Sequence, residues 1–204
     1  YSLALDLYKE CEQIWQPLLQ LKPDSMSDPN YAYIYIAIGD IHRANKEYTL
    51  ALECYTKALH LYDEIIEETS RKGSPTAALA DAQSIVFERL FLVYIRLKKQ
   101  SSNPFAFDTY DKTNSEEYDK KAAEYLNRLM EYTKEQVQRF PTLYWRDSLS
   151  IVFHHFGTYY ESLMGQENLE NAAENYEQSA LIQEQLLEDG FFSPEILNRA
   201  AYAY

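Results

Sequence analysis

Residues 31–65 read YAYIYIAIGDIHRANKEYTLALECYTKALHLYDEI, and this stretch decides the fold. Apolar residues recur at helical spacing on both sides of the polar pair Asn45-Lys46, so we expect two amphipathic helices joined by a short turn. Small residues stand where the two helix backbones would approach each other most closely, namely Gly39, Ala51 and Ala58. Larger residues are expected to fill the space between the helices, namely Tyr35, Ile38, Tyr55 and Leu59. One hairpin cannot bury its apolar face alone, so further hairpins should stack on it.

The spacing within this stretch resembles the tetratricopeptide repeat (TPR), whose pattern is W-x-x-L-G-x-x-Y followed by A-x-x-x-F. The matching residues are Tyr35, Ile38, Gly39 and His42, then Ala51, Tyr55 and Ala58. Twelve residues separate Gly39 from Ala51, as in the family. The departures are Tyr35 for Trp, His42 for Tyr, and Asp63 where the family has a closing Pro. The resemblance implies an all-α fold, a right-handed superhelical solenoid of antiparallel helix pairs with about eight helices.

Weaker copies of the pattern occur elsewhere in the chain. The first-helix half returns around Phe87, Phe153 and Leu197, and only Gly157 keeps the glycine, which Phe91 and Ala201 replace. We therefore predict a single TPR-like domain over residues 1–204. Its parts are a half repeat (1–21), a pair over 31–70, a pair over 76–139 with a long loop (100–114), a pair over 142–188, and a half repeat (193–204).

The predicted loop over residues 100–114 is polar but carries Phe105, Phe107 and Tyr110. A loop of this length is either functional or mobile. Its aromatic residues either pack back on the helices or belong to a disordered segment; the alternative is that the loop folds over the groove or docks a partner. Asn114 and Glu117 have the spacing of a capping box, which predicts that the next helix begins at residue 115.

The composition favours a protein partner over a nucleic acid or a membrane. The net charge is −13 at pH 7, which disfavours direct binding to nucleic acids or anionic membranes and favours a basic or neutral partner. The alternative is a merely solvated acidic surface. No apolar run approaches 18 residues, so membrane insertion is not expected. The 19 tyrosines suit helix packing and also binding surfaces.

Two further expectations concern the location and the start of the chain. Cys11 and Cys54 stand at small-residue positions and are expected to be buried free thiols, which suits a reducing compartment: the cytoplasm, with the nucleus as the alternative. Because the chain already follows a helical pattern at Tyr1, the helix that pairs with residues 1–21 is expected to precede it.

The sequence shows no pattern that indicates catalysis. Neighbouring residues on a helix point about 100° apart, so His154 and His155 cannot ligate one ion from one face. No nucleophile with its base, no phosphate-binding loop and no paired-cysteine motif stands out. We therefore expect no enzyme, no cofactor and no metal.

The TPR resemblance implies a peptide groove lined by the first helix of each pair. The family positions fall on Tyr33, Ile36, Asp40 and Arg43, on Ile85, Glu88, Leu92 and Ile95, and on Ile151, His154, Thr158 and Glu161. This surface is apolar and mildly acidic, so it suits an extended or helical peptide with apolar and basic side chains. Ile36 and Asp40 replace the Lys and Asn with which one subfamily grips a terminal carboxylate, so that kind of clamp is not expected. The alternative is that these residues only pack against adjacent helices.

These observations predict a non-enzymatic interaction module or scaffold that binds a protein segment in its concave groove or along its acidic surface. Two alternatives stay open. One is a regulatory domain in which a bound peptide changes the superhelix pitch. The other is the helical accessory region of a larger enzyme. The sequence does not indicate the oligomeric state.

Overall fold

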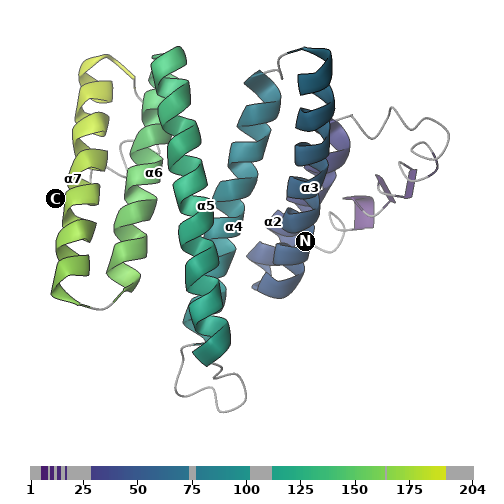
Figure 1. Ribbon diagram of the computed structural model, residues 1–204, viewed down its shortest axis with the longest axis horizontal. Helices are drawn as coiled ribbons and strands as arrows, with labels where there is room; N and C mark the ends of the chain where they lie inside the picture. The colour runs from purple at the N-terminus through teal and green to yellow at the C-terminus, as the bar shows by residue number, and fades with distance from the viewer. Residues whose placement is uncertain are drawn as a thin grey trace. The chain divides into compact units, whose positions relative to one another are not determined.

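The computed structural model describes residues 6–8, 10, 11, 13, 14, 17, 29–73, 77–101, 112–163 and 165–191. Its longer helices are α2 (Pro29–Ala44), α3 (Tyr48–Lys72), α4 (Ala77–Ser101), α5 (Lys112–Arg139), α6 (Leu143–Ser162) and α7 (Gln166–Glu188) (Figure 1). No strand occurs within these ranges. The predicted all-α fold, with adjacent helices packed on one another, is confirmed.

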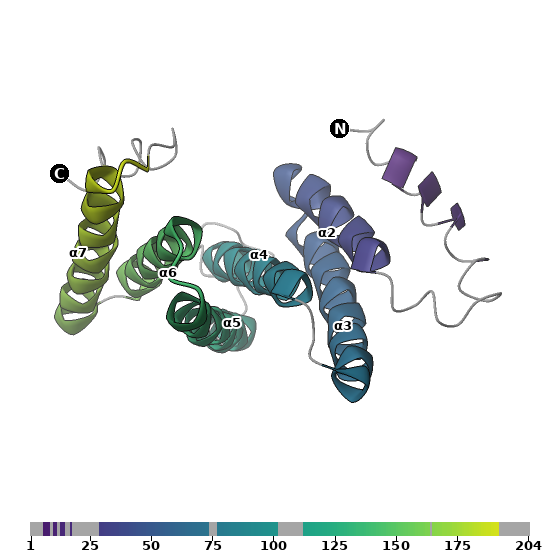
Figure 2. The ribbon, with the colours of Figure 1, turned by 90° about the horizontal axis from the view of Figure 1, so that it is seen from above.

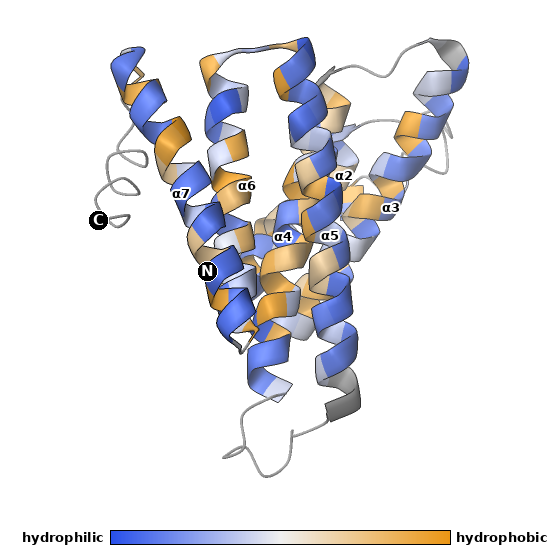
Figure 3. Cartoon of the chain, turned by 60° about the vertical axis from the view of Figure 1, so that its left-hand side comes forward, coloured by the Kyte–Doolittle hydropathy of each residue, from blue (hydrophilic) through white to orange (hydrophobic). Residues whose placement is uncertain are grey.

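The chain divides into two units, residues 1–122 and 123–204, and α5 runs from the first into the second. In both units the helices are amphipathic, and Figure 3 shows hydrophobic and hydrophilic residues on different sides of the same helix. No helix in the described ranges is long and apolar enough to cross a membrane.

The first unit is built on the α2–α3 hairpin, with α4 packed against α3 (Figure 2). Lys46 turns the chain between α2 and α3 with a φ of 65°, and the backbone N–H of Glu47 donates to the carbonyl oxygen of His42. The residues predicted to fill and line the joint are buried, namely Tyr35, Ile38, Gly39, Ala51, Tyr55, Ala58 and Leu59. On α4, Val86, Leu90 and Val93 are fully buried and complete the core of this unit.

Gly39 is needed because α2 and α3 touch at its position. A Cβ atom on Gly39 would lie 2.6 Å from Cε1 of Tyr55, which is closer than real Cβ atoms approach other atoms. The ring of Tyr55 is fully buried and fills the space that the missing side chain leaves.

The second unit holds residues 123–139 of α5 and the α6–α7 hairpin, whose two helices lie side by side along their length (Figure 1). The side chain of Thr142 caps α6 by accepting from the backbone N–H of Trp145. The hydroxyl of Ser179 on α7 donates to the carbonyl oxygen of Ser150 on α6 at 2.8 Å. This buried polar contact fixes the two helices to each other.

Two local predictions are wrong. The helix α5 begins at Lys112, so Asn114 lies inside the helix and is not its N-cap. Cys11 is exposed and Cys54 is only partly buried. Leu7 and Ile14, which share helical spacing with Cys11, are 53% and 64% exposed.

Other expectations fall on residues outside the described ranges. These are the aromatic residues Phe105, Phe107 and Tyr110, the half repeat over 193–204, and most of the half repeat over 1–21. They stay predictions, as does the single domain over residues 1–204.

Candidate functional site

The predicted groove residues of the first unit differ in their access to solvent. Tyr33 on α2 and Ile85 on α4 are 56% and 37% exposed, so they offer apolar surface to a partner. Leu92 is partly buried. Ile36 and Ile95 are only 2% and 5% exposed, because both pack in the core. These two residues are buried beneath the surface and do not line it.

Asp40 is the centre of a polar network that joins α2 to α3. Its Oδ1 atom accepts a hydrogen bond from the hydroxyl of Tyr55 at 2.7 Å and another from Arg43 at 3.2 Å. Nε of Arg43 also donates to the Tyr55 hydroxyl at 3.3 Å. Burial, and then the nearby carboxylate of Asp40, raise the pKa of Tyr55. The phenol therefore stays protonated and keeps its role as donor to Asp40.

The same network reaches α4 through Arg89. Nε of Arg89 lies 3.0 Å from Oδ1 of Asp40, and its Nη1 donates to Glu88 at 3.0 Å. The Nε contact is an ion pair and not a hydrogen bond, since this buried N–H has no hydrogen-bond acceptor in the described structure. Asp40, Arg43 and Glu88, three predicted groove residues, are thus brought together. The guanidinium groups of Arg43 and Arg89 both contact Asp40, so their positive charges compensate its negative charge within the protein.

The second unit repeats this joint on α6 and α7. A Cβ on Gly157 would lie 2.5 Å from Cε1 of Tyr176. The hydroxyl of Tyr176 contacts Oγ1 of Thr158 at 3.3 Å and donates to Glu161 at 2.9 Å. Burial, the largest cause, raises the pKa of Tyr176. Thr158 and Glu161 stand one and four residues after the glycine, the places that Asp40 and Arg43 take in the first unit.

The remaining predicted positions of α6 lie around this joint. The imidazole of His154 is exposed, and its centre is 5.2 Å from the centre of the Tyr176 ring. Ile151 is partly buried, and Glu161 is exposed. The helix α6 therefore presents an imidazole and a carboxylate that both contact Tyr176.

The rings of His154 and His155 are 6.4 Å apart. Within the described ranges no three His, Cys, Asp or Glu side chains form a group that could hold a metal ion. The polar networks above consist of carboxylates, guanidinium groups, phenols and the hydroxyl of Thr158. They connect helices.

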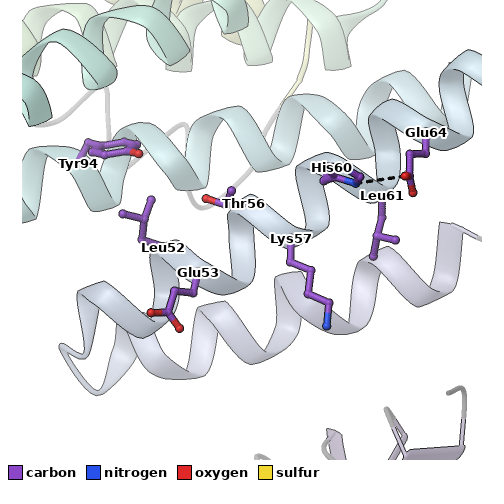
Figure 4. Close-up of a pocket in the computed structure, with 8 residues that line it drawn as sticks. All are labelled: Leu52, Glu53, Thr56, Lys57, His60, Leu61, Glu64 and Tyr94. Atoms are coloured by element: carbon purple, nitrogen blue, oxygen red, sulfur yellow. Dashed lines mark ion pairs between the residues drawn. The ribbon is translucent and has the colours of Figure 1, made fainter.

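An open groove of about 700 Å³ runs along α3, and the sequence pattern did not predict it (Figure 4). It is lined by seven residues of α3 and one of α4: Leu52, Glu53, Thr56, Lys57, His60, Leu61, Glu64 and Tyr94. None of them is a predicted groove position. The signal in the sequence was the pair of i, i+4 rows on α3, but every helix has such rows, so the spacing alone does not distinguish a groove.

Comparison of the sequence with models of protein families and with curated proteins finds no match. The resemblance to the TPR family therefore rests on the residue pattern and on the hairpin joints described above.

Proposed function

We propose that the chain is a non-enzymatic, TPR-like interaction module that binds a protein segment on the first helices of its hairpins, α2 and α4 in the first unit and α6 in the second. One observation carries the proposal: the glycine–tyrosine joint occurs in both α2–α3 and α6–α7, with the tyrosine hydroxyl bonded at the same two motif positions. Repetition of a joint is typical of helical-repeat proteins, whose extended surfaces serve binding. A right-handed superhelix of about eight helices is part of this proposal.

Two exposed apolar residues indicate where the binding face of the first unit lies. Tyr33 and Ile85 are exposed on α2 and α4, and the Asp40–Arg89 ion pair connects these two helices. An exposed tyrosine and an exposed isoleucine match the apolar and aromatic anchors that supply much of the binding energy in interfaces. The polar network fixes the two helices, so the binding face is formed before the partner arrives.

The charge of the surface indicates the chemistry of the partner. Asp40 is neutralised by Arg43 and Arg89, so it offers little attraction to a cation. In the second unit Glu161 is exposed, and the group that donates to it is the uncharged hydroxyl of Tyr176. Together with the net charge of −13, this favours a segment with apolar side chains and some basic ones.

Affinity capture with paired variants tests the proposal. The variant Tyr33→Ala/Ile85→Ser removes the exposed apolar side chains without touching the polar network. The control Leu169→Ser/Leu181→Ser removes two apolar side chains of α7 that are 53% and 47% exposed. We expect a partner that co-purifies with the wild type and the control to be lost from the first variant. Equal recovery with all three proteins would show that this face does not bind it.

A further inference from the structure

We infer that the groove along α3 is a second docking site and that its occupant is a short amphipathic helix with a basic residue near each end. This inference is independent of the proposed binding face on α2 and α4. It rests on the shape of the groove, on its apolar floor and on the charges at its two ends.

The shape of the groove fits a helix. Its α3 residues form two rows at i, i+4 spacing, one made of Leu52, Thr56, His60 and Glu64 and the other of Glu53, Lys57 and Leu61. Figure 4 shows these rows on opposite sides of the α3 ribbon, with the first row toward α4. The furrow between two such rows accepts the side-chain ridge of a second helix. A volume of about 700 Å³ is enough for several side chains of that ridge.

The floor of the groove is apolar. Leu61 is 6% exposed and lies near one end of the groove, while Leu52 and the ring of Tyr94 are partly buried toward the other end (Figure 4). An occupant must therefore bring apolar side chains to displace water from these three residues. Helices that bind in grooves do this with apolar residues three and four positions apart.

The ends of the groove are acidic. Glu53 and Glu64 are both exposed and stand eleven residues apart on α3, which corresponds to about 16 Å along the helix axis. The one lysine of the lining, Lys57, is held over the ring of Tyr35, with its Nζ 4.0 Å from the ring centre. Its charge is thereby directed toward α2, away from both ends. His60 lies 3.5 Å from Glu64 and adds a full positive charge only when it is protonated.

This charge pattern selects a partner with complementary charges. A helix of about four turns, with a lysine or arginine near each end, places its cations beside Glu53 and Glu64 while its leucine ridge occupies the furrow. A helix with acidic ends would instead meet two carboxylates of the same sign. The groove therefore distinguishes basic from acidic helices of equal hydrophobicity.

A designed pair of peptides tests the inference on the full chain. The probe is a fluorescein-labelled helical peptide of about 15 residues with a leucine ridge and one lysine near each end. Its counterpart has glutamates in place of the two lysines. We expect fluorescence anisotropy at low salt to show about tenfold tighter binding of the basic peptide, the size expected for two exposed ion pairs against two repulsions.

Variants connect this preference to the groove. Glu53→Lys/Glu64→Lys should weaken binding of the basic peptide about tenfold and strengthen binding of the acidic one. The control Glu131→Lys/Glu177→Lys changes the net charge equally at exposed residues of α5 and α7, and should alter either affinity less than twofold. Thr56→Trp fills the furrow from an exposed position and should abolish binding of both peptides.

Several results would overturn the inference. Equal binding of both peptides, or equal effects of the two charge-reversal variants, would show that only the net charge of the chain acts. A dimer of the free protein that Thr56→Trp dissociates would show that a second copy occupies the groove. The variant Tyr33→Ala/Ile85→Ser should bind the basic peptide with the affinity of the wild type. The test of the α3 groove is therefore separate from the test of the proposed binding face.

Discussion

Replacement of Gly39 by alanine tests the joint on which the hairpin depends. Alanine favours a helix interior over glycine by about 1 kcal/mol, so the substitution should stabilise α2 if its surroundings were open. They are closed: the new Cβ would lie 2.6 Å from Cε1 and 2.8 Å from Cδ1 of Tyr55. Ordinary van der Waals contact begins at 3.4 Å, so the ring must move by roughly 0.8 Å.

The ring of Tyr55 cannot move this far without a loss of folding stability. Its side chain is fully buried, and its hydroxyl is held by Asp40 at 2.7 Å and by Arg43 at 3.3 Å. Overpacking of this kind costs about 1–3 kcal/mol, and a weakened hydroxyl contact adds about 1 kcal/mol. After the helix-propensity gain is subtracted, we expect Gly39→Ala to destabilise the first unit by about 1–3 kcal/mol.

Thermal unfolding followed by circular dichroism measures this loss of stability, which should lower the unfolding midpoint by about 2–4 °C per kcal/mol in a chain of this length. Faster hydrogen exchange of the α2 amides would show that the loss of stability occurs in the first unit. In the background of Tyr55→Leu the ring is absent, so Gly39→Ala should become neutral or stabilising. Gly157→Ala should cost less than Gly39→Ala, because Tyr176 is only partly buried and its ring can turn outward. An unchanged or raised midpoint for Gly39→Ala in the wild-type background would refute the reasoning.

Three further predictions concern the polar contacts of the first unit. Tyr55→Phe removes a donor to the Asp40 carboxylate and should lower the unfolding free energy by about 1–3 kcal/mol in urea titrations; no loss would show that the contact is not stabilising. Arg89→Leu removes the ion pair between α4 and Asp40, so exchange of α4 amides should quicken, whereas unchanged rates would exclude a role in fixing these helices. Burial raises the pKa of Tyr62 from 10.0 to about 12, so the unfolded chain releases this proton first and stability should fall as the pH rises from about 10 to 12. Tyr62→Phe should flatten that part of the stability curve, and an equally steep curve would contradict the assignment.

The parts of the fold that depend on local periodicity could be predicted from the sequence. The spacing around Gly39 identified the α2–α3 hairpin and the residues buried in it, because close approach of two helices restricts which residues fit. The second glycine, Gly157, identified the same joint between α6 and α7. Predictions that rested on a short motif or on the apolar face of a single helix were less reliable. Asn114 and Glu117 have capping-box spacing inside a continuous helix, and Leu7, Cys11 and Ile14 have helical spacing but are exposed.

The candidate site could be predicted only in part, because it depends on contacts between helices. The family positions pointed to Asp40 and Glu88, but not to Arg89, which joins them from a position that the repeat pattern leaves unspecified. The pattern placed Ile36 on the surface, whereas the packing of α2 buries it. The groove along α3 was missed for a related reason: its floor includes Tyr94 of α4, and its depth follows from the packing of two helices.

The most direct test of the proposed function is quantitative affinity capture, compared between the wild type, Tyr33→Ala/Ile85→Ser and the α7 control Leu169→Ser/Leu181→Ser. The measurement is the amount of each co-purifying protein by mass spectrometry, after circular dichroism has shown that all three chains are folded. We predict that at least one protein is recovered equally with the wild type and the control and falls about tenfold or more with the first variant, as expected when an exposed aromatic anchor is removed. A set of captured proteins that is the same for all three chains would contradict the claim that the face of α2 and α4 binds a protein segment.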